Sequence, residues 1–336
     1  MNAGAADLHP SDPSMEHTVK PAAILIGRNE GARFRACLAS LGDQFSHVVY
    51  VDSGSTDGSI EAAEAAGLEV VHLDRSQPFT AARARNAGLA QVAALATPPD
   101  YVQFMDGDCA LQPGWVETAR AFLDASPKVA MACGRRRERF PEASVYNRLI
   151  DEEWDTPTGR TRASGGDVMG RFAALQAVGG FNPNLIAGEE PELCLRLRNA
   201  GWEIWRLDAE MTEHDADLTR FSQWWQRARR AGYTYAEGAA MYGNTPERHK
   251  VQALRSTLAW GLALPLTLIA LALLVSPWAL LGMLIWPLQV LRLRLKGMAW
   301  AKALFLTLAK FPETQGVLTY GWRRLTRRRA RLIEYK

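Results

Sequence analysis

The feature that most constrains this chain is a run of 36 residues, 256–291, without a charged side chain. One straight helix of that length would measure about 54 Å, whereas the hydrocarbon core of a bilayer is about 30 Å thick. The "SPW" at 276–278 offers a break, because Pro277 lacks a backbone donor and restricts the residue before it. We therefore expect a transmembrane helical hairpin, 256–275 and 278–291.

The charges around this run predict its orientation. Basic residues flank it on both sides: Arg248, Lys250, Arg255, Arg292, Arg294 and Lys296. Because positive residues are retained on the cytoplasmic side, both ends of the hairpin are expected at the cytoplasmic face of the inner membrane, together with the preceding part of the chain. The alternative is a buried helix pair of a soluble protein, which the lack of a polar stripe disfavours.

The basic residues are concentrated in the last quarter of the chain. From residue 251 onward there are 13 Lys and Arg against two acidic residues, whereas the first 250 residues hold 26 against 34. Such a tail suits an anionic partner, either membrane lipids or nucleic acid. The apolar run favours lipids, so no nucleic acid is expected, and the region 292–336, including an amphipathic stretch with Lys302 and Lys310, is expected to lie at the lipid surface.

The rest of the chain predicts one α/β domain, 21–250. Four apolar runs alternate with Ala-rich runs of helical spacing, at 22–27, 47–52, 68–74 and 101–106. This alternation predicts a mostly parallel sheet with helices on both faces. The four scattered cysteines form no CxxC pair, so reduced thiols and no structural zinc are expected, and residues 1–20 lack an apolar segment and are expected to be disordered.

Two of the apolar runs end in acidic residues. Asp106 and Asp108 follow "YVQFM", where open α/β sheets bind ligands, and two carboxylates one residue apart suit a hard divalent ion such as Mg²⁺ or Mn²⁺. Asp52 ends "VVYVD" and can accept a hydrogen bond from a base or ribose. The alternatives are a loop with solvated acids and an ordinary strand-turn-helix with capping residues. No GxGxxG or GxxxxGK[ST] motif follows any of these runs.

Five motifs in order resemble glycosyltransferase family 2: "LIGRNEG" (25–31), "VDSGSTDGS" (51–59), "ARNAGL" (84–89), "MDGDCALQPGW" (105–115) and "VGGFNPNLIAGEEPELCLRLRNAGW" (178–202). The resemblance covers about residues 21–215. It implies the GT-A fold, which is Rossmann-like, a nucleotide-diphosphate sugar donor, a divalent metal, Mn²⁺ or Mg²⁺, and transfer of one sugar with inversion.

The resemblance also implies which residues bind the donor and the metal. The donor-side residues would be Arg28, Asn29, Glu30, Asp52, Ser53, Arg85, Asn86 and Asp106. Asp52 matches the acid beside the base, and Ser53 stands where the family often has a second Asp. Asp106 and Asp108 match the DxD pair, with Asp108 as the direct metal ligand, and His214 matches the histidine that often completes the metal shell.

On the acceptor side the chain departs from the family. The stretch "GEEPELCLRLRNAG" has Glu190 where the family has its catalytic Asp, with Glu189 before it, so either Glu is a candidate general base. A helix start stabilised by acidic residues is the alternative. Asp167 matches a strand facing the sugar and acceptor, and Gln226 and Arg229 loosely resemble a synthase signature that touches acceptor or diphosphate.

The reaction expected is addition of one sugar to a lipid-linked or envelope saccharide acceptor, because one hairpin offers few spans for a polymer channel. Two other classes stay open. A nucleotidyltransferase could share the fold and metal, but "GRNEG" is not a basic Gly-rich loop. A non-catalytic membrane subunit could retain the fold if Glu190 reflects loss of activity.

Overall fold

The computed structural model describes residues 20–326, so the expectations for 1–19 and for 327–336 lie outside the described residues. The strands are β1 Ala22–Gly27, β2 His47–Asp52, β3 Glu69–His72, β4 Tyr101–Asp106, β5 Cys109–Leu111, β6 Val129–Glu138, β7 Gly159–Thr161, β8 Val168–Arg171 and β9 Glu203–His214. The helices of the sheet layer are α1 Ala32–Leu41, α2 Ser59–Ala65, α3 Ala81–Ala94, α4 Trp115–Ala125, η1 Pro141–Ala143, α5 Val145–Trp154, α6 Phe172–Ala177 and α7 Glu189–Asn199. The later helices are α8 Phe221–Tyr242, α9 Val251–Leu258, η2 Ala259–Ala263, α10 Leu264–Leu274, η3 Pro277–Leu284, α11 Ile285–Leu295, α12 Trp300–Leu308 and α13 Lys310–Leu325.

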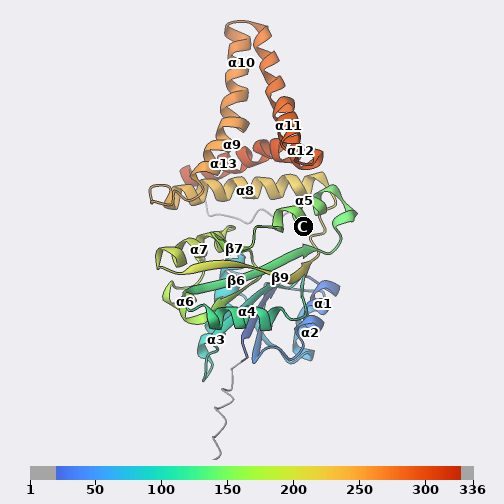
Figure 1. The fold of residues 1–336 in the computed structure, drawn as a ribbon, viewed down its shortest axis with the longest axis vertical. Helices are drawn as coiled ribbons and strands as arrows, with labels where there is room; N and C mark the ends of the chain where they lie inside the picture. The colour runs from blue at the N-terminus through green and yellow to red at the C-terminus, as the bar shows by residue number, and fades with distance from the viewer. Residues whose placement is uncertain (1–19, 327–336) are drawn as a thin grey trace, which may run out of the picture.

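One sheet of nine strands forms the centre of the domain, in the order β3-β2-β1-β4-β8-β6-β9-β5 with β7 paired to β9 (Figure 1). Strands β3, β2, β1 and β4 are parallel, and β6 is parallel to β9. Strands β5, β7 and β8 pair in antiparallel fashion. The predicted parallel sheet is therefore present as the first part of a mixed sheet. It is extended by the long parallel pair β6 and β9 and by three short strands of three or four residues.

The strand order reverses between β1 and β4, and at such a point open α/β sheets have their ligand crevice at the carboxyl ends of the strands. Helices α1 and α2 contact each other on one face of the sheet. Helix α3 connects β3 to β4 and so crosses the sheet in the reverse direction. Because such crossovers are right-handed, α3 lies on the opposite face. In register, Gly27 lies beside Asp52 and Ile26 beside Asp106. The two acid-ended strands thus present their carboxylates at one edge.

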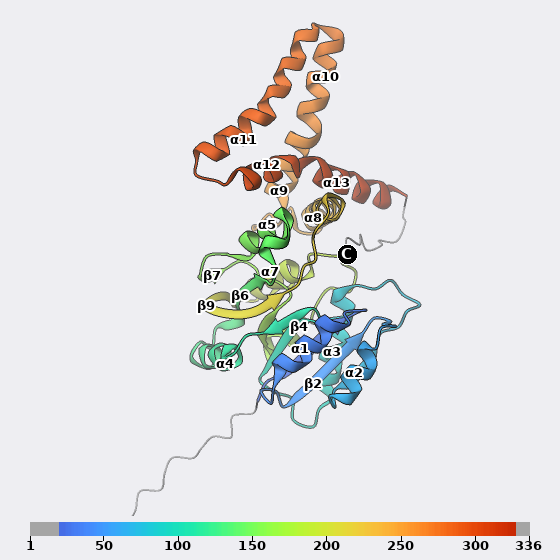
Figure 2. The ribbon, with the colours of Figure 1, turned by 90° about the vertical axis from the view of Figure 1, so that its right-hand side faces the viewer.

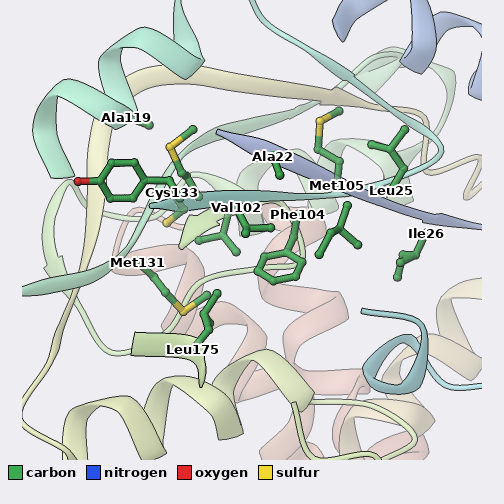
Figure 3. Close-up of a cluster of buried hydrophobic side chains, with 14 of the residues drawn as sticks. Ala22, Leu25, Ile26, Val102, Phe104, Met105, Ala119, Met131, Cys133 and Leu175 are labelled. Atoms are coloured by element: carbon green, nitrogen blue, oxygen red, sulfur yellow. The ribbon is translucent and has the colours of Figure 1, made fainter. Parts of the chain in front are cut away.

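The core fills the space between sheet and helices. Figure 3 shows part of it, with Leu25, Phe104, Met105 and Met131 among the buried side chains. Each such side chain contributes roughly 1.5–3 kcal/mol relative to an exposed one. Gln103 is a polar residue among them, and its Oε1 accepts a hydrogen bond of 2.8 Å from the indole of Trp115. The core therefore holds the strand that carries Asp106 rigidly.

The C-terminal helices form a separate layer and a projecting hairpin. Helices α8 and α13 lie across the top of the sheet domain, and α10 and α11 extend away from them (Figures 1 and 2). Two helices are long and apolar enough to cross a membrane, Val251–Leu274 and Pro277–Leu295, and their most apolar windows are 6% and 0% buried in the structure. The break at Pro277 was correctly predicted, but both helices extend beyond 256–275 and 278–291 into the basic flanks. The alternative of a buried helix pair does not match this exposure.

Aromatic side chains join α8 to the C-terminal helices. The Trp224 ring lies 4.8 Å from Phe305 of α12, and the indole of Trp225 donates to Gln315 of α13. On the other side, Lys302 of α12 pairs with Glu152 of α5 at 3.1 Å. The C-terminal helices are thus packed on the sheet domain rather than merely tethered to it.

Two glycines allow α8 and α13 to approach closely. A Cβ at Gly316 would collide with the carbonyl oxygen of Arg229 and would lie 2.6 Å from the backbone nitrogen of Tyr233. A Cβ at Gly232 would collide with the backbone of Glu313. Because backbone atoms cannot move aside as a flexible side chain can, the two helices would have to separate.

We expect Gly316→Ala to lower the unfolding temperature of the detergent-solubilised protein, because overpacking typically costs about 1–3 kcal/mol. The matched control is Gly321→Ala in the same helix, where an added Cβ meets nothing within 4 Å. It should be neutral or stabilising by roughly 0.5–1 kcal/mol through helix propensity. Equal unfolding temperatures for the two variants would show that α13 is not closely packed on α8.

Candidate functional site

A buried arginine connects three acidic residues at the crevice. Arg85 of α3 is 2% exposed, and its Nη1 lies 3.0 Å from Glu189 Oε1 and 2.8 Å from Glu190 Oε1. Its Nη2 donates to Asp106 Oδ1 at 2.9 Å. A planar guanidinium can reach carboxylates on two sides at once. Arg85 therefore joins the end of β4 to the start of α7. Glu189, the first residue of α7, is 104 positions from Arg85 in the sequence.

The charges in this cluster shift one another's ionisation. Burial lowers the pKa of Arg85, but the carboxylates of Glu190, Asp106 and Glu189 together raise it by more than burial lowers it. The pKa of Arg85 therefore lies above its ordinary value, and the guanidinium stays charged. Burial and the neighbouring charge of Glu189 raise the pKa of Glu190 to about 7, against the lowering effect of Arg85. Glu190 is 16% exposed and Glu189 5%. Glu190 is therefore the more accessible of the two, and its proton exchanges near neutral pH.

A second arginine lies on the other side of Asp106. The Nη2 of Arg136, at the end of β6, is 3.4 Å from Asp106 Oδ2, and its Nε is 3.5 Å from Asp167 Oδ2. Burial raises the pKa of Asp106, but Arg85 and Arg136 lower it more, so its pKa lies below its ordinary value. Asp167 also accepts from the amide of Asp106 at 3.1 Å and from Thr212 at 2.7 Å. Asp167 thus holds the end of β4 in place.

Glycine is required beside this pair of ions. A Cβ at Gly166 would lie 2.5 Å from Arg85 Nη2 and 3.1 Å from Asp106 Oδ2. The backbone of the loop before β8 therefore passes directly over the ion pair, where a larger residue would push it apart.

A donor set for a metal lies next to the cluster. His214 Nε2 is 3.2 Å from Asp108 Oδ2, and these two with Cys109 offer ligand atoms within 4.8 Å of one another. Burial raises the pKa of the Cys109 thiol well above its ordinary value, which leaves the carboxylate and the imidazole as the donors. Asp106 belongs to a different group, with Cys109 and Asp167. A carboxylate and an imidazole, both buried and facing each other, fit one divalent ion.

The residues expected near the nucleotide form the neighbouring edge of the crevice. Asn29 has φ 58° and its side chain accepts from the amide of Thr56 at 2.8 Å, while its own amide donates to Ser55. Asp52 is 1% exposed and accepts from the amides of Gly54 and Ser55 at 2.7 and 3.0 Å. Asp52 therefore shapes its own loop, and the loops after β1 and β2 are bound to each other.

The remaining expected residues of this edge differ in exposure. Arg28 is exposed, and Glu30 pairs with Arg33 at 2.9 Å. Ser53 is buried, and its hydroxyl has no hydrogen-bond partner within residues 20–326. The exposed guanidinium of Arg28 is the more accessible of these groups, whereas the Ser53 hydroxyl is buried.

Three expected residues lie outside the cluster. Both atoms of the Asn86 amide bond the backbone of Phe181, at 2.7 and 2.8 Å, so Asn86 fixes the loop before α7. Gln226 and Arg229 contact each other on α8, and Arg229 reaches Thr319 of α13. The sequence placed these side chains at the diphosphate or the acceptor, whereas in the structure they bond other parts of the chain.

Two residues of the cluster were not predicted. The Arg136 guanidinium lies 4.7 Å from the Trp154 ring, and Trp154 packs edge-on against His214 at 4.9 Å. The sequence does contain an indication for Arg136. The basic run "RRRER" directly follows the apolar run "VAMACG", just as Asp106 follows the apolar run "YVQFM". The flanking arginines pair with acids, Arg135 with Asp151 and Arg137 with Glu210, which leaves Arg136 for the site. Nothing in the sequence singles out Trp154.

Comparison with known proteins identifies the domain. Residues 23–177 match the model of glycosyl transferase family 2. These residues, slightly less than half of the chain, form a glycosyl transferase family 2 segment. The matched segment contains the strands that bear Asp52 and Asp106 and the helix that bears Arg85, and it ends before Glu189.

Relatives of the family 2 domain include named glycosyltransferases. A pre-mycofactocin glycosyltransferase of Mycobacterium tuberculosis is 27% identical over 240 residues, which are 67% of this chain but 48% of that protein. The succinoglycan biosynthesis protein ExoA of Rhizobium meliloti is 24% identical over 274 residues, 77% of this chain and 79% of that protein. The chain therefore spans about half the length of the mycobacterial relative.

A solved structure shows the same fold. A mannosyltransferase from Pyrobaculum calidifontis, in complex with GDP-Man and Mn²⁺, superposes with a TM-score of 0.57 at 18% identity. The match covers 93% of this chain and 90% of that one. The GT-A fold expected from the motifs is confirmed.

The Arg85 cluster generates a stability prediction for the family 2 domain. Replacing Arg85 with Met leaves three carboxylates without their shared cation, and breaking a buried pair costs about 3–5 kcal/mol. We expect a clear fall in the unfolding temperature. Arg137→Met is the control, since its pair with Glu210 is exposed and worth about 0–1 kcal/mol. Equal falls in both variants would mean that the cluster contributes no more than a surface ion pair.

Proposed function

We propose that this protein is an inverting glycosyltransferase that moves one sugar from a nucleotide-diphosphate sugar to a lipid-linked or envelope saccharide acceptor at a membrane. One observation carries the proposal: Arg85 joins Asp106, on the donor side, to Glu189 and Glu190, on the acceptor side. A single displacement needs a charged leaving-group site and a base on opposite sides of one sugar. The named relatives and the mannosyltransferase fold support the same reaction class.

The donor side is formed by the crevice between the loops after β1, β2 and β4. We assign Arg28, Asn29, Glu30 and Ser53 to the nucleoside, and Asp52 to holding their loop. Asp108 and His214 would hold the cation, Mn²⁺ or Mg²⁺, with Asp106 next to it. When bound, that cation supplies Lewis-acid stabilisation of the charge on the leaving nucleoside diphosphate. Arg136 adds a fixed positive charge beside Asp106.

The acceptor side is formed by the start of α7. In the proposed reaction the acceptor oxygen attacks the anomeric carbon, the bond to the diphosphate oxygen breaks, and the acceptor proton passes to Glu190. A base with a pKa of about 7 is matched to this transfer at neutral pH, because it is partly ionised and still basic. Glu189 is more deeply buried and is assigned to holding Arg85. Asp167 fixes β4, and Gln226 and Arg229 fix α8 to α13.

The membrane assignment follows from the hairpin. Helix Val251–Leu274 would span about 36 Å, and η3 with α11 about 32 Å, because a 3₁₀-helix rises about 2.0 Å per residue. Both values match a hydrocarbon core of about 30 Å. We propose that the hairpin is inserted in the inner membrane, with the sheet domain on the cytoplasmic side and the basic C-terminal region on lipid headgroups.

Donor turnover separates the proposal from its two alternatives. A transferase incubated with a nucleotide-diphosphate sugar and Mn²⁺ releases nucleoside diphosphate, a nucleotidyltransferase exchanges pyrophosphate, and a non-catalytic subunit does neither. The crevice has no basic Gly-rich loop, which disfavours the second class.

We expect Asp108→Asn to abolish metal-dependent activity while the protein stays folded, because removing a carboxylate ligand weakens binding of a divalent cation. Asp208→Asn, an exposed position on β9, is the charge-matched control and should be fully active. EDTA should stop the wild-type reaction, and added Mn²⁺ or Mg²⁺ should restore it. Full activity of Asp108→Asn in EDTA would overturn the metal assignment.

We expect Glu190→Gln to lower kcat by about 10²–10⁴-fold, since that is the usual contribution of a general base. It should bind nucleoside diphosphate normally, and Glu190→Asp should retain part of the activity. The wild-type rate should rise with pH through an inflection that Glu190→Gln removes, because only the ionised carboxylate accepts a proton. Its pKa of about 7 applies without a bound cation, so the inflection of the metal-bound enzyme should lie below that value.

Glu189→Gln is the matched comparison for this base. If Glu190→Gln turns over normally while Glu189→Gln is inactive, the base is Glu189. If both turn over normally, the stretch is only a helix start and the base lies elsewhere.

A further inference from the structure

A basic cavity lies beside the proposed base and is not used by the donor site. It has a volume of about 270 Å³ and is lined by the loop before α9, the end of α7 and the segment after β7. A second cavity of about 540 Å³ shares Arg162, Arg198 and Glu247 with it. Pro191, the residue after Glu190, lines the first cavity directly.

The charges of this cavity leave a positive excess. Glu247 accepts from both Arg198 and Arg162 at 2.6 Å, and hydrogen bonds from these arginines lower the Glu247 pKa to about 2. One carboxylate therefore offsets one of the two arginines. Arg248 and Lys250 also line the cavity, and neither forms an ion pair within residues 20–326. The cavity thus presents several cationic groups to one acid.

The backbone adds to this positive potential. Helix α9 begins after Lys250 without a side-chain cap, and Gln252 and Ala253 of its first turn line the cavity. The first amides of a helix have no intrahelical acceptor, and the N-terminus carries partial positive charge. Arg248 and Lys250 have φ of 47° and 59°, a conformation that costs energy in residues other than glycine. This backbone conformation places two cationic residues and a helix start around one cavity.

The cavity also lies where the chain enters the hairpin. Lys250 immediately precedes Val251–Leu274, the first helix long enough to span a bilayer. In Figure 1 the start of α9 lies between the sheet domain and α10. An anionic group bound here would therefore be close to Glu190 on one side and to the apolar helices on the other.

We propose that this cavity binds a phosphate group of the acceptor, so that an acceptor anchored through phosphate presents its hydroxyl to Glu190. That the phosphate belongs to the acceptor rests on the proposed function. Clustered cationic side chains with a helix N-terminus are suited to phosphate. The same chemistry would suit a phosphate on a lipid or free phosphate, and the binding probes below distinguish these sources.

The test measures binding to the full chain in neutral-detergent micelles by calorimetry, with three probes: dodecyl phosphate, dodecanol and inorganic phosphate. Dodecyl phosphate should bind more tightly than either of the others, because it combines the anionic group with an apolar tail. Equal binding of dodecyl phosphate and dodecanol would overturn the phosphate assignment. Equal binding of dodecyl phosphate and inorganic phosphate would overturn the lipid source.

Matched double variants locate the binding. Arg248→Gln with Lys250→Gln should weaken dodecyl phosphate binding by about tenfold or more, since each charge-assisted hydrogen bond is worth about 1.5–3 kcal/mol. Arg294→Gln with Lys296→Gln removes the same charge at the other end of the hairpin and should change affinity by less than about twofold. Equal losses in both pairs would show general attraction to the micelle surface and overturn the proposal.

The readout is separate from turnover. Nucleoside diphosphate binding with Mn²⁺ and the unfolding temperature serve as folding controls for both double variants. If dodecyl phosphate binds as expected but no sugar is transferred, the cavity assignment stands and the proposed function fails. If sugar is transferred but the Arg248 and Lys250 variant has the wild-type KM for a phosphate-bearing acceptor and wild-type affinity for dodecyl phosphate, the cavity assignment fails alone.

Discussion

The site depends on one buried guanidinium shared by three carboxylates. Arg85 is fixed on α3, whose close packing on β1 requires Gly88, because a Cβ there would collide with Ile24. From this position it holds Asp106 at 2.9 Å and the two acids that open α7 at 2.8 and 3.0 Å. Desolvating a cation is costly unless several partners compensate it. The carboxylates therefore keep Arg85 charged, and Arg85 keeps them together.

This arrangement links the sheet to the layer of C-terminal helices. Gly188, which precedes α7, lies with its backbone against Thr234 of α8, and Tyr242 of α8 donates to Glu192 of α7 at 2.5 Å. Helix α8 in turn packs against α13 through Gly232 and Gly316. Contact runs without interruption from Arg85 to the C-terminal helices. The position of Glu190 is consequently set from two sides, by the sheet and by the layer that carries the hairpin.

The sequence predicted those parts of the molecule that depend on local pattern. Apolar runs ending in Asp52 and Asp106 predicted two parallel strands with acids at one edge, and Pro277 predicted the break of the hairpin. The apolar pattern did not predict β5 or β7, because three residues are too few to show alternation and their pairing depends on distant strands. The strand beside Asp167, β8, was expected only from the family resemblance. Arg136 and Trp154 were missed because they meet Asp106 and His214 only through the tertiary fold. Asn86 matched a motif, yet its amide bonds Phe181, 95 residues away, which no local pattern indicates.

The balance of charge explains why a glutamate can occupy position 190. Five carboxylates, those of Asp106, Asp108, Asp167, Glu189 and Glu190, face two guanidinium groups in one crevice. Such an excess favours protonation of the acid that is least well compensated, and Glu190, next to Glu189, is the one whose pKa rises to about 7. Positive charge added near the cluster favours the ionised form of every acid in it, so binding a cation at Asp108 and His214 would favour ionised Glu190 as well. The longer side chain of Glu also lets it reach Arg85 while it stays partly exposed. Glu190 is therefore held by the same guanidinium that holds Asp106, and a cation bound at Asp108 and His214 would change its ionisation.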